Sequence, residues 1–97
     1  DFAKAMIDEG YEPMTMYFPL VVHGAMLIEP TESESKQSLD LFIATLRDLA
    51  KDARSGNDKS RFKEAPRLAP RRRLDETKAA RKPRLRWRPA ARPEAAE

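Results

Sequence analysis

The sequence predicts a small α+β unit over residues 1–55, followed by a basic, proline-rich tail over residues 56–97. Charge is the first indication. Residues 1–53 hold four Lys/Arg against ten Asp/Glu, a formal charge of −6, whereas residues 54–97 hold fifteen against six, a formal charge of +9. Most large apolar residues lie in the first part, and five of the eight prolines lie in the second. Ordering about 50 residues costs about 1.5 kcal/mol of conformational entropy each, which offsets most of the stabilisation that apolar burial can give so short a segment. We therefore expect the first part to pack against a larger body.

The first element is predicted to be a helix over residues 1–9. Apolar residues recur there between Lys4, Asp8 and Glu9, and Gly10 suits the left-handed cap at a helix end. The chain opens on Asp1, inside this helical pattern, so we expect its natural amino terminus to lie upstream.

Two short strands are expected next. Residues 15–18 are β-branched and aromatic and stop at Pro19, and residues 25–29 are entered through Gly24 and end before Pro30. We expect the two strands to pair antiparallel and to form a small sheet edge.

A long helix is predicted from about residue 32 to 53. Thr31 stands three residues before Glu34, which is the capping-box spacing at a helix start, and Ser55-Gly56-Asn57-Asp58 ends the pattern. Apolar residues recur at three- and four-residue steps and predict one buried face: Leu39, Phe42, Ile43, Leu46, Leu49, Ala50 and Ala53.

The tail is expected to be extended, with one short helix possible from Leu74 to Arg81, because its prolines are closely spaced. Leu85 and Trp87 stand among arginines and could anchor the tail in a groove of a neighbouring surface. The dense basic run is also compatible with binding to nucleic acid through phosphates. No nucleic-acid-binding motif accompanies it, so we expect docking on an acidic protein surface, or simple solvation, and not nucleic acid.

Few residues offer chemistry. His23 titrates near neutral pH and is a weak catalytic candidate, although no partner is identifiable and a structural role is the simpler interpretation. Glu29, Glu32 and Glu34 could be paired catalytic carboxylates, but helix capping explains two of them. The chain has no cysteine and one histidine, so we expect no metal site. Its longest apolar stretch, Tyr17 to Ile28, is too short to span a membrane, and we expect a cytoplasmic protein.

Two long motifs carry a resemblance to a known family. Residues 17–36 read YFPLVVHGAMLIEPTESESK, and the tail contains RRLDE at 72–76, KAARKP at 78–83 and LRW at 85–87. These runs, in this order, resemble the carboxy-terminal part of glycine dehydrogenase (decarboxylating), the P-protein of the glycine cleavage system, in its subunit 2 form. Residues 89–97 do not follow the family's pattern and form a short extension. Arg84 stands where the family pattern leads us to expect an apolar residue.

The resemblance implies part of the small carboxy-terminal domain of a fold-type I enzyme that depends on pyridoxal phosphate (PLP). Such an enzyme decarboxylates glycine and passes the aminomethyl group to the lipoyl H-protein, and it works with the other P-protein subunit. The cofactor lysine would lie upstream of Asp1, so we expect no cofactor-binding residue in this chain. Two rival hypotheses remain: an interaction module that binds an acidic protein, and a small nucleic-acid-binding protein.

Overall fold

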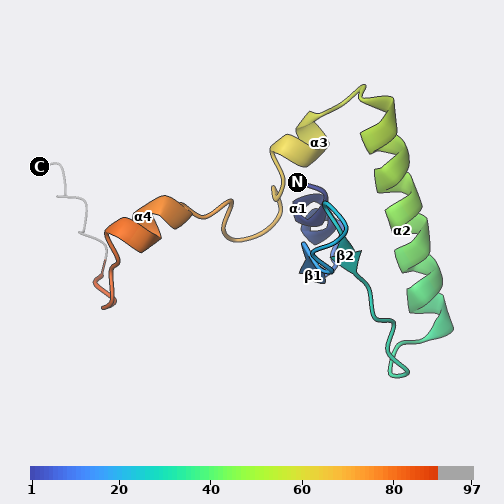
Figure 1. The fold of residues 1–97 in the computed structure, drawn as a ribbon, viewed down its shortest axis with the longest axis horizontal. Helices are drawn as coiled ribbons and strands as arrows, with labels where there is room; N and C mark the ends of the chain where they lie inside the picture. Colours follow the sequence, from blue (N-terminus) through green and yellow to red (C-terminus); the bar gives the residue numbers. More distant parts are fainter. Residues whose placement is uncertain (90–97) are drawn as a thin grey trace, which may run out of the picture.

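The computed structural model describes residues 1–89. Within these residues, four helices and a two-stranded sheet follow one another (Figure 1). Their bounds are α1 Phe2–Asp8, β1 Thr15–Met16, β2 Met26–Leu27, α2 Lys36–Ser55, α3 Ser60–Lys63 and α4 Glu76–Arg81. The carboxy-terminal end of the predicted tail, from residue 90, lies outside the described residues.

The expected helix and strand pair at the amino-terminal end are confirmed, with shorter strands. Gly10 adopts φ 90° just after α1, as its place in the sequence predicts. β1 and β2 pair antiparallel, with Thr15 opposite Leu27 and Met16 opposite Met26. Each strand holds only two residues, because Tyr17 has φ 58° and turns the chain out of the extended conformation.

The predicted start of the long helix is wrong by several residues. α2 begins at Lys36, and Ser35 is its N-cap, with its Oγ accepting from the Ser38 N–H at 3.1 Å. Thr31 caps no helix, because its hydroxyl bonds to the Ser33 hydroxyl at 2.9 Å and its carbonyl accepts from the Glu34 N–H at 3.1 Å. Those two bonds close a separate turn before the helix. The predicted helix end is confirmed, with Gly56 left-handed at φ 64°.

The Ser35 cap leads to a first prediction. Replacing Ser35→Ala in the full-length protein is expected to cost about 1 kcal/mol and to speed hydrogen exchange of the first turn of α2 about fivefold, because the Ser38 N–H loses its acceptor. Replacing Thr31→Ala removes a similar hydroxyl that serves no helix, so it is the matched control and should change exchange little. Equal effects of the two changes would contradict the placement of the cap.

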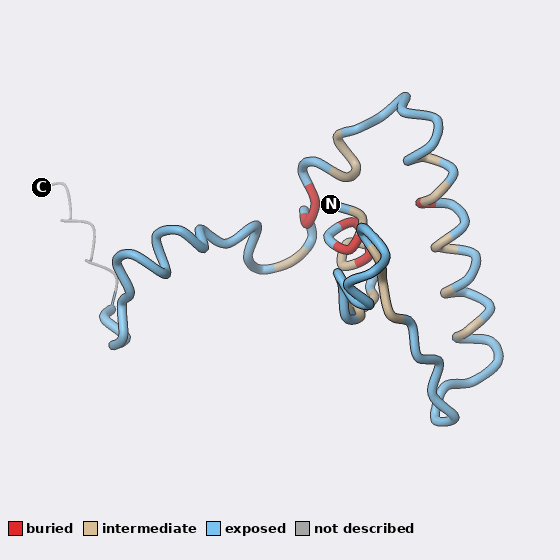
Figure 2. Tube along the Cα trace, in the orientation of Figure 1, coloured by how far each residue is buried: buried red, intermediate tan, exposed pale blue. Residues whose placement is uncertain are grey.

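The core is small and lies where α1, α2 and the segment after α3 meet. Met6 and Leu49 are fully buried, and Ala5 and Ala65 complete the buried cluster (Figure 2). Partly buried hydrophobic side chains surround it: Phe2, Tyr11, Met14, Met26, Phe42, Leu46 and Phe62. The predicted apolar face of α2 is therefore only partly buried.

One side of that predicted face is open to solvent. Ile43 is 47% exposed and Ala53 is exposed, although both belong to the expected stripe. The reason is that α2 meets the other elements along a single line of contact, and within the described residues nothing covers the outer half of the stripe. When neighbouring elements bury only part of an apolar helix face, the rest of that face can pack against a further layer.

The chain after α2 returns to α1. The Phe62 ring in α3 stacks on the Phe2 ring, with centroids 6.0 Å apart. The backbone N–H groups of Leu68 and Arg67 donate to the Asp8 carboxylate at 2.7 to 2.8 Å. These hydrogen bonds hold the pKa of Asp8 below its usual value, and the bond from Leu68 has the largest effect. Desolvation of the carboxylate acts in the opposite direction. Part of the segment that the sequence assigns to the tail thus packs on the folded unit.

Beyond Arg73 the chain leaves the folded unit, and the described residues end at the far side of the molecule (Figure 1). The short helix expected between Leu74 and Arg81 is present as α4, capped by the Asp75 carboxylate, which accepts from the Lys78 N–H. After α4 the chain bends at Arg86, and the Arg84 guanidinium donates to the Arg88 carbonyl at 2.8 Å. Within residues 1–89 no helix is both long and apolar enough to cross a bilayer.

Candidate functional site

An exposed apolar loop joins the two strands. We call residues 16–22 the apolar loop, and all six of its large hydrophobic side chains are exposed, with Leu20 at 86% and Val21 at 92%. His23 follows directly and is also exposed. Within residues 1–89 no group of three His, Cys, Asp or Glu side chains could hold a metal ion. The loop is therefore an uncovered hydrophobic surface with a histidine at its edge.

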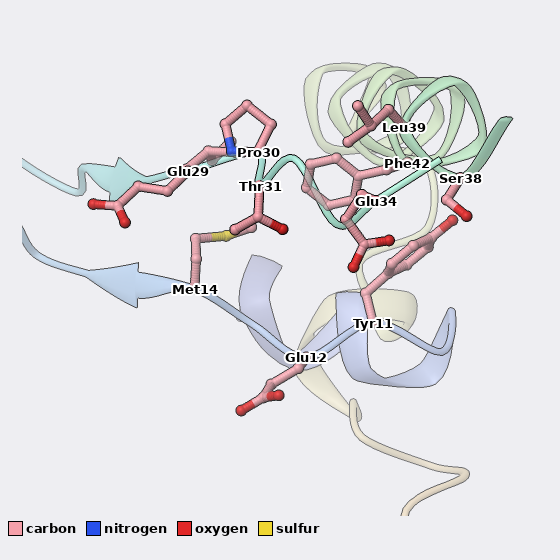
Figure 3. Close-up of a pocket in the computed structure, with 11 residues that line it drawn as sticks. Tyr11, Glu12, Met14, Glu29, Pro30, Thr31, Glu34, Ser38, Leu39 and Phe42 are labelled. Atoms are coloured by element: carbon pink, nitrogen blue, oxygen red, sulfur yellow. The ribbon is translucent and has the colours of Figure 1, made fainter. Parts of the chain in front are cut away.

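A groove of about 360 Å³ lies between the segment 28–31 and the start of α2 (Figure 3). Tyr11 and Phe42 meet edge to face across it, with ring centroids 5.3 Å apart. Most of the lining is apolar. It consists of Tyr11, Met14, Ile28, Pro30, Leu39 and Phe42 together with the polar residues Glu12, Glu29, Thr31, Glu34 and Ser38.

The charges at the groove have one sign. Three carboxylates line it, from Glu12, Glu29 and Glu34, and no lysine or arginine does. Glu34 points toward Tyr11, whereas Glu12 and Glu29 point away from Phe42 at the outer edges (Figure 3). No ion pair within residues 1–89 engages any of the three. The groove thus has an apolar floor and an acidic rim, and it suits a ligand with an apolar centre and positive charges around it.

Arg61 makes the densest polar cluster. One of its nitrogens donates to Glu9 at 2.8 Å and to Asp48 at 3.0 Å, and the other donates to Asp52. Hydrogen bonds to Glu9 and then to Asp52 raise the pKa of the Arg61 guanidinium above its usual value. Since the carboxylates come from the end of α1 and from α2, this cation joins three parts of the chain. The cluster therefore holds these parts of the chain together.

The arginines of the tail fall into two groups. Arg73 pairs with Asp1 and donates to the carbonyls of Phe62 and Ala65, and Arg72 donates to the Glu64 carbonyl at 2.8 Å. These two residues fasten the segment after α3. Farther along, Leu85 is 90% exposed and Trp87 is 85% exposed, set among arginines. This second group is open to contact with another surface.

Comparison with known proteins identifies the family. The family model described as "Glycine dehydrogenase, C-terminal domain" matches residues 1–70. The chain belongs to the glycine dehydrogenase family. It is 76% identical, over its whole length, to "Probable glycine dehydrogenase (decarboxylating) subunit 2" of Caulobacter vibrioides. It is also 52% identical, over 90% of its length, to the protein of the same name from Caldanaerobacter subterraneus subsp. tengcongensis.

The chain spans 18% of the length of each of these two relatives. It is therefore a carboxy-terminal fragment of a glycine dehydrogenase, with helices and a small two-stranded sheet, and the family resemblance found in its motifs is confirmed. The match to the Caulobacter relative includes the tail.

The groove does not fit PLP. All seven lysines are exposed, and Lys36 and Lys63 pair with Asp40 and Asp1. A site for the cofactor needs a lysine within reach of the ring and cationic or N–H groups around a phosphate. The groove has no lysine and is edged by carboxylates, so it would repel that phosphate. The groove is therefore not a candidate for the cofactor site, and the expectation that this chain holds no cofactor-binding residue stays a prediction.

Sequence reasoning missed the residues that fasten the segment after α2. Arg61 was not singled out among many arginines, because charge patterns do not show which partners are near in space. Phe62 carried a visible signal, since it is the only aromatic residue between Phe42 and Trp87. An isolated aromatic residue in a charged stretch is a candidate for burial in the core or at an interface.

Proposed function

We propose that this chain acts as part of a PLP-dependent, aminomethyl-transferring glycine dehydrogenase of the glycine cleavage system. The complete enzyme would decarboxylate glycine and transfer the aminomethyl group to the lipoyl H-protein, together with the other P-protein subunit, in the cytoplasm. The observation that carries the proposal is the match of residues 1–70 to the glycine dehydrogenase carboxy-terminal domain. The test is to assay glycine decarboxylation by the full-length subunit with its partner subunit and the H-protein. No carbon dioxide release would refute it.

Within that enzyme, the segment is proposed to be part of the small carboxy-terminal domain of a fold-type I subunit. The apolar loop and the open half of the α2 stripe support this proposal, because exposed contiguous hydrophobic surface marks a site that another body covers. Residues upstream of this chain would supply that body. His23 lies at the edge of the apolar loop, and it stays a candidate for acid–base work there.

We expect the isolated chain neither to bind PLP nor to decarboxylate glycine, because the cofactor lysine and the phosphate-binding groups would lie in the upstream part. Mixing the chain with PLP should give no absorbance band of a lysine-bound cofactor, and borohydride reduction should leave the chain mass unchanged. The full-length subunit is the control and should show both signals. Attachment of the cofactor to Lys36 or Lys51 in the isolated chain would contradict the assignment.

A second candidate function is an interaction module whose basic tail binds an acidic protein. The exposed Leu85 and Trp87 favour such contacts, and they agree with a docking role inside the enzyme. A separate nucleic-acid-binding role receives no support from the described residues beyond the charge itself. The enzyme proposal explains both the apolar loop and the tail, so we prefer it.

A further inference from the structure

The groove and the end of the tail have complementary surfaces. The groove has an apolar floor of aromatic and aliphatic side chains and three carboxylates at its rim. The segment 84–88 presents two exposed apolar side chains, Leu85 and Trp87, between three arginines. Within residues 1–89 no acidic side chain pairs with these arginines, just as no basic one pairs with the groove carboxylates.

The two surfaces lie apart within one chain. The groove lies by the loop that precedes α2, and the tail runs to the opposite end of the molecule beyond α4 (Figure 1). The segment from Glu64 to Arg73 is fixed to the folded unit by Arg72, Arg73 and Asp8, which directs the tail outward. The tail is thus turned away from its own groove.

We propose that residues 84–88 of one copy of this chain bind the groove of a second copy in the assembled enzyme. Leu85 and Trp87 would lie on the floor formed by Tyr11, Pro30 and Phe42. The arginines would face the rim carboxylates, an arrangement that sets specificity and association rate. If the exchange is mutual, each subunit gives one tail and accepts one, which closes a two-fold dimer.

Trp87 is the expected anchor. Binding energy at interfaces concentrates in a few residues, and Trp and Arg are the most frequent among them. Five tail residues bury less than the roughly 1,200 Å² of a stable interface, so the tail would strengthen contacts made elsewhere in the subunit. This inference rests on the proposed function, because it assumes that the segment works inside a multi-subunit glycine dehydrogenase.

The first test measures assembly of the full-length enzyme by sedimentation. Trp87→Ala is expected to weaken self-association of the subunit at least about tenfold, and Leu74→Ala, which also removes an exposed leucine of the tail, is the matched control. Truncation after Lys82 should match Trp87→Ala, and it spares Arg72 and Arg73, which fasten the chain internally. Unchanged association of both altered enzymes would overturn the proposal.

Charge reversal identifies the partner surface. Arg86→Glu and Glu34→Arg should each weaken association, and the two changes together should restore most of it, whereas Arg71→Glu should have little effect. If the double variant is as weak as the sum of the single ones, the tail does not contact this groove.

A crosslink shows which molecule supplies the tail. Ser38→Cys is placed in one copy and Leu85→Cys in a differently tagged copy, and this part of the chain has no cysteine of its own. A disulfide between the two tagged copies is expected on oxidation, and not with either variant alone. A crosslink to the other P-protein subunit, or one formed only inside a single doubly substituted chain, would overturn the proposal. Glycine decarboxylation by the unaltered enzyme is measured in parallel, so that failure of the proposed function is seen separately.

Discussion

Replacing Leu49→Ala is expected to lower the free energy of unfolding of this domain by about 2–5 kcal/mol, the range measured when buried leucines are cut back to alanine. Leu49 has no solvent exposure and lies in the buried cluster with Met6, Ala5 and Ala65. Two of these neighbours are alanines, whose short side chains cannot move to fill the space. The lost burial and the remaining cavity should therefore both lower the free energy of unfolding.

The measurement is native-state hydrogen exchange of the α2 amides in the full-length subunit. Leu41→Ala is the matched control, because it makes the same change in the same helix at a side chain that is 58% exposed. It should cost less than about 0.5 kcal/mol. If Leu49→Ala cost no more than Leu41→Ala, the core would have been placed wrongly.

Replacing Arg61→Met is expected to cost roughly 1–2 kcal/mol, because it leaves the carboxylates of Glu9, Asp48 and Asp52 facing one another without their shared cation. This expected cost lies between two known ranges: losing an exposed ion pair costs at most about 1 kcal/mol, and removing one partner of a buried ion pair costs about 3–5 kcal/mol. Arg61 is 26% exposed and its partners are more exposed, so water screens part of the effect.

The salt dependence of stability distinguishes the loss of ion pairs from the loss of packing. Added salt weakens the ion pairs of the unaltered protein but relieves the repulsion in the Arg61→Met variant, so their stabilities should converge as salt rises. Arg47→Met is the control, since Arg47 is an exposed α2 arginine that makes no ion pair within residues 1–89. A stability difference that stayed constant up to high salt would attribute the loss to packing instead.

The sequence predicted the order of the elements apart from α3, because local chemistry determines most of them. Gly10 and Gly56 mark helix ends through their backbone freedom, and the period of Phe42, Leu46 and Leu49 indicates a helix with one apolar face. The start of α2 was predicted wrongly because two hydroxyl caps compete within five residues. Thr31 has the better local spacing with Glu34, yet its hydroxyl bonds to Ser33, and Ser35 takes the cap.

The groove and the packing after α2 could not be predicted, because they depend on contacts between residues far apart in the sequence. Asp8 accepts from backbone groups 59 and 60 residues away, and nothing in its neighbourhood indicates this. The acidic rim of the groove joins Glu12 to Glu29 and Glu34 across the hairpin. The sequence did suggest what kind of groove the tail would suit. It gave no indication that this chain itself forms one.

The long separation between α1 and its partners has a consequence for synthesis of the protein. A ribosome adds about 5–20 residues per second, so the 60 residues from Asp8 to Leu68 take about 3–12 s to make. Until the interval ends, α1 lacks the backbone donors of Arg67 and Leu68, and until Phe62 is made it also lacks that ring, so Met6 is without part of its cover. The packing around α1 is therefore completed only after Leu68 has been added. A ribosome that stalls before Leu68 would leave the apolar side of α1 open to chaperones and proteases.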